Sequence, residues 1–267
     1  MNPQSETNPI CTLVIPTYNA AAFIARSVER LSAFLAANPE FCVLFVCDGC
    51  TDDTPAQLET LTRDQPRMNV QSYTKNRGKG YAVKNGMWRA QTPYRIFTDA
   101  DLAYAPEEAV KLLALLRAGA DMVVVNRAHP DSRYLISPTD FPNIYKRHRM
   151  SRAFNAFLRW MLPIKILDTQ AGLKGFTAKT WDRIGAHIVT DGFFFDVELL
   201  AYAGAANLTI KETPIYFEYV DPTTVRMVKH GWSMILDTIR LRWRLRQEPR
   251  KSARPAAKLV PAGADAN

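Results

Sequence analysis

The sequence predicts an α/β fold with a doubly wound, mostly parallel sheet that carries helices on both faces. The chain has 267 residues, enough for one large α/β domain or two small ones. Its 47% hydrophobic and 22% charged residues are ordinary for a globular protein, which excludes a disordered chain, a collagen and a disulfide-stapled miniprotein. Apolar strand-like runs alternate with helix-like stretches through the first half, a rhythm typical of parallel sheets.

The expected elements follow one another regularly through the first half. Apolar runs predict strands at Cys11–Ile15, Cys42–Cys47, Asn69–Tyr73, Tyr94–Thr98 and Met122–Val125. The stretches between them predict helices at Ala22–Ala36, Pro55–Leu61, Tyr81–Ala90 and Pro106–Leu116. The second half contains two candidate amphipathic helices. One is Ile144–Leu162, and the other is indicated by an apolar stripe of Trp232, Ile235, Leu236, Ile239 and Trp243. Either helix could pack on the core or lie against a lipid surface.

We expect one folded domain at residues 10–247, between a flexible N-terminus (1–9) and a basic, disordered tail (248–267). The tail is rich in Pro, Ala, Lys and Arg, a composition that buries little apolar surface. No run approaches about 18 apolar residues, and the N-terminus has no apolar signal core. We therefore expect a cytoplasmic protein without a membrane span.

The net charge of +8 comes mostly from the C-terminal end of the chain. Eight basic residues and one acid, Glu248, lie between Arg240 and Lys258, and the rest of the chain is nearly neutral. A basic end of this kind suits an anionic membrane surface or a nucleic acid, or it only keeps the chain soluble.

The four cysteines lie near the N-terminus, at Cys11, Cys42, Cys47 and Cys50. The last two have CxxC spacing. A zinc site would need a second, suitably spaced pair of ligands, which the sequence lacks. A redox role for Cys47 and Cys50 stays open at this point.

A polar segment follows each of the expected strands. These segments are Pro16–Asn19, Cys47–Thr54, Thr74–Gly80, Thr98–Asp101 and Asn126–His129. Ligands of open parallel sheets bind beyond the carboxyl ends of the strands, so the segments predict a shared site. Their acids, glycines and bases fit an anionic ligand held together with a metal. The segment Asn76–Gly80 resembles a phosphate cradle, but it is too short for a Walker A loop.

Asp99 and Asp101 follow a strand at a spacing that lets both carboxylates reach one hard cation. Mg²⁺ or Mn²⁺ is held in this way when water and diphosphate oxygens complete its shell. The alternative is a helix cap, because Ala105-Pro106-Glu107 begins a helix just after. Asp48 could accept hydrogen bonds from a base or ribose, or form a turn with Gly49.

Four segments, in order, resemble the motifs of the inverting family 2 glycosyltransferases, which have the GT-A fold. They are Ile15-Pro16-Thr17-Tyr18-Asn19, Asp48-Gly49-Cys50-Thr51-Asp52-Asp53-Thr54, Asn76-Arg77-Gly78-Lys79-Gly80 and Thr98-Asp99-Ala100-Asp101-Leu102. Two later segments, Asp168–Lys174 and Phe195–Leu200, resemble the dolichyl-phosphate glucosyltransferase branch and its bacterial polyprenyl-phosphate relatives. The resemblance implies one GT-A domain with a nucleotide-sugar half (10–130) and an acceptor half (131–247).

The resemblance implies transfer of a hexose, with glucose the first candidate, from a UDP-sugar to a lipid phosphate such as polyprenyl phosphate. It also implies Mg²⁺ or Mn²⁺, and a place on the cytoplasmic face of an anionic membrane. A hydroxyl acceptor, mannosyl transfer from GDP-mannose to polyprenyl phosphate, and a nucleotide-sugar-binding scaffold remain alternatives. A nucleic-acid-binding protein would explain the basic tail but not the paired aspartates.

The resemblance assigns roles to individual residues. Its catalytic candidates are Asp168, Asp196 and Arg127, with Glu198 next. Its donor-binding candidates are Pro16, Tyr18, Asp48, Lys79, Asp99, Ala100 and Asp101, of which Asp99 and Asp101 hold the metal. Its acceptor-binding candidates are Gln170, Lys174, Arg226 and Lys229. For Asp196 and Glu198 the alternative is a carboxylate that is only favoured by the dipole at a helix N-terminus.

Overall fold

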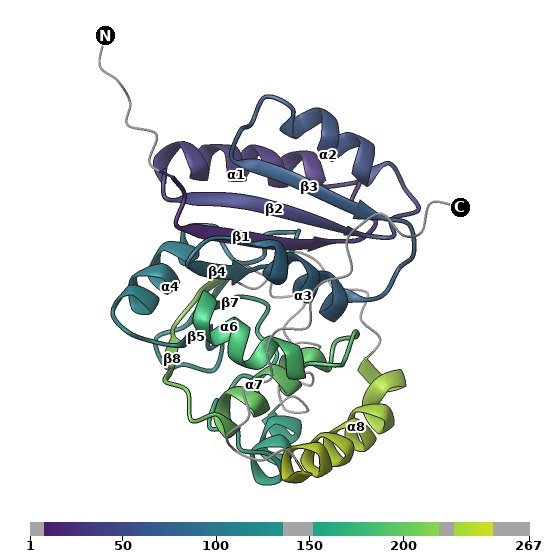
Figure 1. Cartoon of the computed structure of the whole chain (residues 1–267), viewed down its shortest axis with the longest axis vertical. Helices are drawn as coiled ribbons and strands as arrows, with labels where there is room; N and C mark the ends of the chain where they lie inside the picture. Colours follow the sequence, from purple (N-terminus) through teal and green to yellow (C-terminus); the bar gives the residue numbers. More distant parts are fainter. Residues whose placement is uncertain (1–7, 136–151, 219–226, 248–267) are drawn as a thin grey trace.

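The computed structural model of the protein describes residues 8–135, 152–218 and 227–247. Its centre is a seven-stranded sheet in the order β3-β2-β1-β4-β7-β5-β8 (Figure 1). The strands are β1 (Cys11–Thr17), β2 (Phe41–Asp48), β3 (Met68–Tyr73), β4 (Tyr94–Phe97), β5 (Met122–Val125), β7 (Lys174–Thr177) and β8 (Ile210–Thr213). A separate parallel pair joins β6 (Arg133–Leu135) to β9 (Tyr216–Glu218).

The expected strands of the first half are confirmed as β1 to β5, and the sheet is mostly parallel as predicted. One strand runs the other way: β7 lies between β4 and β5 and pairs antiparallel with both. This strand was not predicted, because its sequence, Lys-Gly-Phe-Thr, has neither an apolar run nor an alternating pattern. The loop that precedes β7 therefore reaches the same edge as the loops that follow the parallel strands.

The helices are α1 (Ile24–Ala37), α2 (Thr54–Thr62), α3 (Lys79–Arg89), α4 (Glu108–Arg117), α6 (Ala178–Ile184), α7 (Phe195–Ala205) and α8 (Met227–Gln247), with a 3₁₀ turn at Gly185–His187. The first four confirm the expected helices to within two residues at each end. A further helical segment covers 152–161, and the first part of the helix expected at Ile144–Leu162 lies outside the described residues. The expected N-terminus (1–9, apart from its last two residues) and tail (248–267) also lie outside them.

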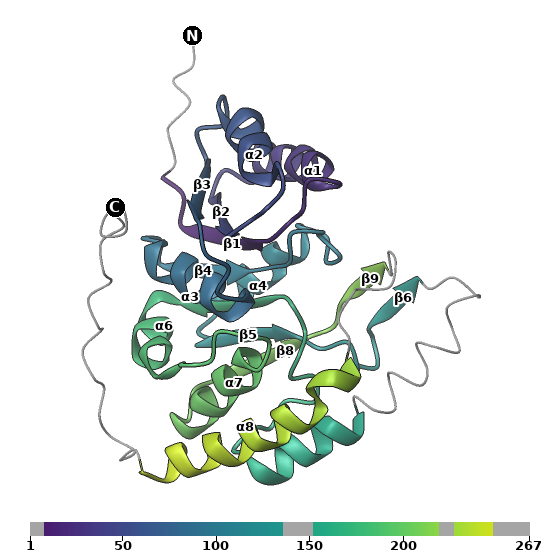
Figure 2. The same cartoon turned by 90° about the vertical axis from the view of Figure 1, so that its right-hand side faces the viewer.

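Helices cover both faces of the sheet, as expected. Alternate residues of β1 point to opposite sides, so Leu13 and Ile15 join one core while Val14 joins the other. Helices α1, α2 and α4 contribute to the first core, and α3, α6 and α7 to the second. The segment 152–161 and α8 form an outer layer beyond α7, side by side (Figure 2).

The outer layer is attached to the body through specific contacts. Leu158 and Leu241 are fully buried, and the Arg242 guanidinium donates to the carbonyl of Met161 over 2.8 Å. The Arg244 guanidinium lies 2.6 Å from the buried carboxylate of Glu198 on α7, without the angles of a hydrogen bond. Helix α8 is thus part of the fold. Within the three described ranges, no helix is long and apolar enough to cross a membrane.

Candidate active site

The loop after β4 carries the two expected metal ligands. Asp101 is exposed and Asp99 is partly buried, and the Asp99 carboxylate forms an ion pair with Lys79 at the start of α3. Burial lowers the pKa of Lys79, but the carboxylates of Asp99 and Asp196 outweigh it and raise that pKa above its usual value. Lys79 therefore stays charged and is paired with Asp99, one of the two expected metal ligands.

The surroundings of Asp101 favour a cation. The nearby chain removes part of its water shell and Asp99 adds a second negative charge, and together these raise the pKa of Asp101. A positive ion close to both carboxylates would relieve this repulsion. Among the residues that the structure describes, no group of three or more His, Cys, Asp or Glu side chains could hold a metal. A cation here would therefore depend on this pair, water and diphosphate oxygens, a shell that suits Mg²⁺ or Mn²⁺.

Asp48, expected at the nucleotide base, is almost completely buried at the end of β2. Its carboxylate accepts hydrogen bonds from the backbone N–H groups of Arg77 (2.8 Å) and Gly78 (2.7 Å) and from the hydroxyl of Tyr73 (2.8 Å). Gly49, next in the chain, has a φ of 61°, and a Cβ there would collide with the backbone of Asn76. Asp48 therefore holds the phosphate-cradle segment against the end of β2.

The loop after β1 contains the expected Pro16 and Tyr18. Pro16 is partly buried within β1, and Tyr18 is 50% exposed beside Asn19, which has a left-handed φ of 48°. The side-chain amide of Asn19 forms two hydrogen bonds with Thr51. Its NH₂ group donates to the Thr51 hydroxyl over 3.0 Å, and its oxygen accepts from the Thr51 backbone N–H over 2.8 Å. The two loops are thereby joined, and the Tyr18 ring is left open to a ligand.

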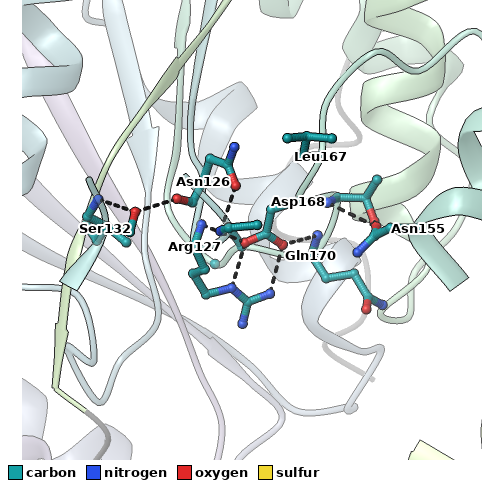
Figure 3. A network of polar contacts seen from close by, with 12 residues as sticks. Asn126, Arg127, Ser132, Asn155, Leu167, Asp168 and Gln170 are labelled. Atoms are coloured by element: carbon teal, nitrogen blue, oxygen red, sulfur yellow. Dashed lines mark hydrogen bonds and ion pairs between the residues drawn. The ribbon is translucent and has the colours of Figure 1, made fainter. Parts of the chain in front are cut away.

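Arg127, after β5, is partly exposed and forms an ion pair with the buried Asp168, before β7 (Figure 3). The Arg127 guanidinium donates to both carboxylate oxygens of Asp168, over 2.7 and 2.9 Å, and the Arg127 backbone N–H donates over 3.0 Å. Burial raises the pKa of Asp168, but the charge and hydrogen bonds of Arg127 outweigh it and hold the pKa below its usual range. Asp168 is therefore an ionised partner of Arg127 and a weak base.

Two neighbouring contacts fix this pair in place (Figure 3). Thr169 donates its hydroxyl over 2.6 Å to Asn155, which is buried in the segment 152–161. The Ser132 hydroxyl donates to the carbonyl of Asn126 over 2.7 Å. Gln170, expected at the acceptor, is partly buried, and its backbone N–H donates to Asp168 over 3.3 Å.

The loop before β7 touches the metal-ligand loop. A Cβ on Gly172 would collide with the carboxylate of Asp99, so any larger residue would displace that carboxylate from its observed position. The backbone N–H of Gly172 donates over 3.3 Å to the hydroxyl of Tyr104, which is 3% exposed. Burial raises the pKa of Tyr104 to about 12, and both Asp168 and Arg127 act on it. The expected donor and acceptor segments therefore meet around Tyr104.

Lys174 and Asp196, expected at the acceptor and among the catalytic groups, are paired inside the protein. The Lys174 side chain is 0% exposed and lies 2.5 Å from the carboxylate of Asp196 in the first turn of α7. Its ammonium also donates to the carbonyl of Ala171. Both side chains are buried, and their pair supports the loop before β7; their expected roles at the acceptor and in catalysis stay predictions. Glu198 is likewise buried against Arg244.

Cys47 and Cys50 are free thiols. Burial raises the pKa of Cys47 to about 12, and burial also raises the pKa of Cys50. Both side chains are therefore protonated at neutral pH, and thiols in that state react slowly. The geometry favours a packing role for the CxxC segment over a redox role.

Two expected acceptor residues cannot be placed in this site. Arg226 lies outside the described residues, and only the backbone of Lys229, at the start of α8, is described. Sequence reasoning missed Tyr104 and Asn155, which hold the loop before β7. Tyr104 follows the paired aspartates closely, and Asn155 is a polar residue between Phe154 and Phe157 on an otherwise apolar helix face. These two sequence features could have identified Tyr104 and Asn155 as candidate site residues.

The sheet has the GT-A fold, which two solved structures share. Glucosyl-3-phosphoglycerate synthase from Mycobacterium tuberculosis, in complex with Mn²⁺, UDP and glucosyl-3-phosphoglycerate, superposes with a TM-score of 0.64 at 16% identity, over 89% of this chain and 81% of that one. The mannosyltransferase PcManGT from Pyrobaculum calidifontis, in complex with GDP-Man and Mn²⁺, gives a TM-score of 0.55 at 19% identity, over 89% and 64%.

The chain belongs to glycosyl transferase family 2, whose model matches residues 12–190. Glycosyltransferase AglD from Haloferax volcanii is 29% identical over 91% of this chain, which spans only 38% of AglD. Polyprenol monophosphomannose synthase from Mycolicibacterium smegmatis is 30% identical over 77% of this chain and 76% of its own length. Dolichyl-phosphate beta-glucosyltransferase from Saccharomyces cerevisiae is 26% identical over 90% of this chain and 76% of its own length.

Proposed function

We propose that this protein transfers a hexose, with glucose the first candidate, from a UDP-sugar to a lipid phosphate such as polyprenyl phosphate. The observation that carries the proposal is the contact of two loops at one edge of the sheet. The loop with Asp99 and Asp101 meets the loop with Asp168 and Gly172. A donor diphosphate on the first loop would then lie beside an acceptor on the second.

The residues on the donor side suit a diphosphate and a divalent cation. Asp99 and Asp101 supply hard oxygen ligands, and the charged Lys79 lies beside them. When bound, Mg²⁺ or Mn²⁺ would neutralise the charge that the diphosphate gains as it leaves. Solved structures of the same fold contain Mn²⁺ together with UDP or GDP-Man, which supports a metal here.

The state of Asp168 supports a phosphate acceptor over a hydroxyl acceptor. A hydroxyl needs a base to take its proton, and a carboxylate whose pKa is held low by Arg127 does this poorly. An oxygen of a lipid phosphate is already anionic at neutral pH and needs no strong base. Arg127 and Asp168 would then position the acceptor instead of removing a proton from it.

The donor base could also be guanine. The relative with 30% identity is a polyprenol monophosphomannose synthase, and this favours GDP-mannose as the second candidate donor. The test is a panel of UDP-glucose, other UDP-sugars and GDP-mannose, each assayed with and without polyprenyl phosphate and Mn²⁺. We expect nucleotide release from UDP-glucose that rises with the lipid. Release with a hydroxyl acceptor only, or none with any donor, would overturn the proposal.

We further propose that the outer layer docks on the cytoplasmic face of an anionic membrane. The outer layer carries four exposed apolar residues, which we name the exposed apolar face. They are Trp160 (78% exposed), Leu236 (54%), Ile239 (50%) and Trp243 (62%). Arg240 and Arg246 are exposed beside them. Because each cation near such a surface contributes about 1 kcal/mol at most, the attachment would be reversible.

Two cations of the basic end, Arg242 and Arg244, are not available for this docking. Both are turned toward the body, on the Met161 carbonyl and the Glu198 carboxylate. Removing them would disturb the fold, so a docking variant has to spare them.

The variant Trp160→Ser/Ile239→Ser/Trp243→Ser is expected to lose co-sedimentation with vesicles of phosphatidylglycerol and phosphatidylcholine. The three side chains are exposed, so soluble UDP-sugar hydrolysis should stay near the wild-type rate. Activity on vesicle-embedded polyprenyl phosphate should fall by at least about tenfold, because apolar contact is lost. Leu61→Ser, which removes an exposed apolar side chain on the distant α2, is the control. Vesicle binding equal to wild type would remove the exposed apolar face from the mechanism.

A further inference from the structure

The phosphate-cradle segment is held from two sides. On one side is Asp48, whose carboxylate accepts from the backbone N–H groups of Arg77 and Gly78. On the other side is Asp191, which comes from the segment between Ile188 and α7, more than a hundred positions later in the chain.

Asp191 contacts the start of α3 through both its side chain and its backbone. Its carboxylate lies 2.6 Å from the ammonium of Lys84, which is 14% exposed, and 3.8 Å from the guanidinium of Arg77. Its carbonyl accepts from the backbone N–H of Tyr81 over 3.2 Å. That N–H lies in the first turn of α3, where the helix itself offers no partner. Asp191 therefore caps α3 from outside.

The glycines of the segment reflect this contact. Gly78 has a φ of 102°, and a Cβ there would lie 2.6 Å from the carbonyl oxygen of Asp191. A Cβ on Gly80 would lie 2.9 Å from the same oxygen. The cradle segment thus packs backbone to backbone against Asp191, and only glycine allows it at these two positions.

We infer that Asp191 is a positioning residue for the donor: it sets the start of α3 so that Lys79 meets Asp99 and Arg77 faces the donor. The position of Arg77 supports this inference. Its guanidinium is held 3.7 Å over the ring of Tyr81 in α3, and its side chain is still 47% exposed and so accessible to a ligand. The far side of the Asp191 segment is fixed as well, since the backbone N–H of Thr190 donates to Glu198 over 2.8 Å. The inference rests on the proposed function only for the identity of the ligand.

The test compares Asp191→Asn with the wild type by amide hydrogen exchange and by binding of UDP with Mn²⁺. We expect exchange at Arg77, Gly78 and Tyr81 to become about tenfold faster, because a charge-assisted contact is lost. The Kd for UDP should rise about tenfold, with little change in acceptor KM. Lys84→Met should reproduce the effect, and the double variant should add nothing to it. Asp64→Asn, an exposed aspartate after α2, is the matched control for charge.

The outcomes separate the inference from the proposed function. Unchanged exchange at the start of α3 would overturn the inference, whatever ligand binds. Faster exchange throughout the protein would also overturn it, because Asp191 would then support general stability. Local loosening in a protein that binds neither UDP nor GDP would support the positioning role and refute the proposed donor.

Discussion

Replacing Asp101 with asparagine is expected to reduce sugar transfer at least about 100-fold while leaving the fold intact. Asparagine keeps the shape of the side chain but removes one of the two charges that would hold the cation. Asp101 is exposed, and its one hydrogen bond in the described structure, from the backbone N–H of Ala103 over 3.1 Å, can still form to the amide oxygen. The melting temperature should therefore change by no more than about 2 °C.

The measurement is UDP release in Mg²⁺ and in Mn²⁺, followed together with thermal unfolding. Asp64→Asn removes one exposed negative charge away from the site edge and should behave like the wild type. If Asp101→Asn keeps a near-normal rate in either cation, Asp101 is not a metal ligand. A large drop in melting temperature would instead assign it a structural role.

The second large effect is expected at Asp168, where an alanine should lower both stability and turnover. The substitution leaves the Arg127 guanidinium and the backbone N–H groups of Arg127 and Gln170 without their carboxylate. Breaking a buried ion pair from one side costs about 3–5 kcal/mol, and the partial exposure of Arg127 brings the expected loss to about 2–3 kcal/mol. Urea unfolding measures this loss.

The loss of turnover should exceed the loss of donor affinity. Asp168 positions Arg127 and the loop before β7, away from the nucleotide, so UDP binding should weaken by less than about threefold while the rate falls at least about 100-fold. Asp168→Asn keeps the shape and serves as the comparison variant. A selective loss of UDP affinity would move Asp168 to the donor side.

The Asp168 pair also predicts how stability depends on pH. Because the folded state holds the pKa of Asp168 below its ordinary value of 3.8, the carboxylate binds its proton more weakly when folded than when unfolded. The stabilisation is therefore complete at pH 7 and is lost as the pH falls below that value through the folded pKa. The difference in unfolding free energy between wild type and Asp168→Asn should shrink over the same range.

The first half of the fold could be predicted because its strands are buried on both faces and read as continuous apolar runs. The second half could not be read in this way. Strand β7 begins with Lys174, a charged residue that is tolerated at the centre of a sheet only because Asp196 neutralises it from α7. Because Asp196 lies outside the strand's own sequence, the local hydrophobic pattern around Lys174 does not predict a buried strand.

The sequence predicted which loops share one edge of the sheet, since parallel strands end together, but it did not predict which side chains pair there. Which acid meets which base depends on approach distances of a few ångströms. Lys79 meets Asp99, and Arg127 meets Asp168, because Gly172 lets the loop before β7 close onto the metal-ligand loop. The sequence shows that residue 172 is a glycine, but it does not show that Asp99 lies against it.

The reversed direction of β7 has a consequence for how such enzymes could diversify. Its N-terminal end, Lys174, lies at the site edge, and its C-terminal end, Thr177, pairs with Tyr94 at the opposite edge. Within the stretch that leads into β7, Asp168 is bound by Arg127 and Gly172 lies against Asp99, so we expect variation at its other positions, where it would not shift the strands that carry the donor loops. Acceptor choice would then evolve separately from donor chemistry. Grafting 163–173 from a relative with another acceptor, while keeping Asp168 and Gly172, would be the natural way to redesign this protein.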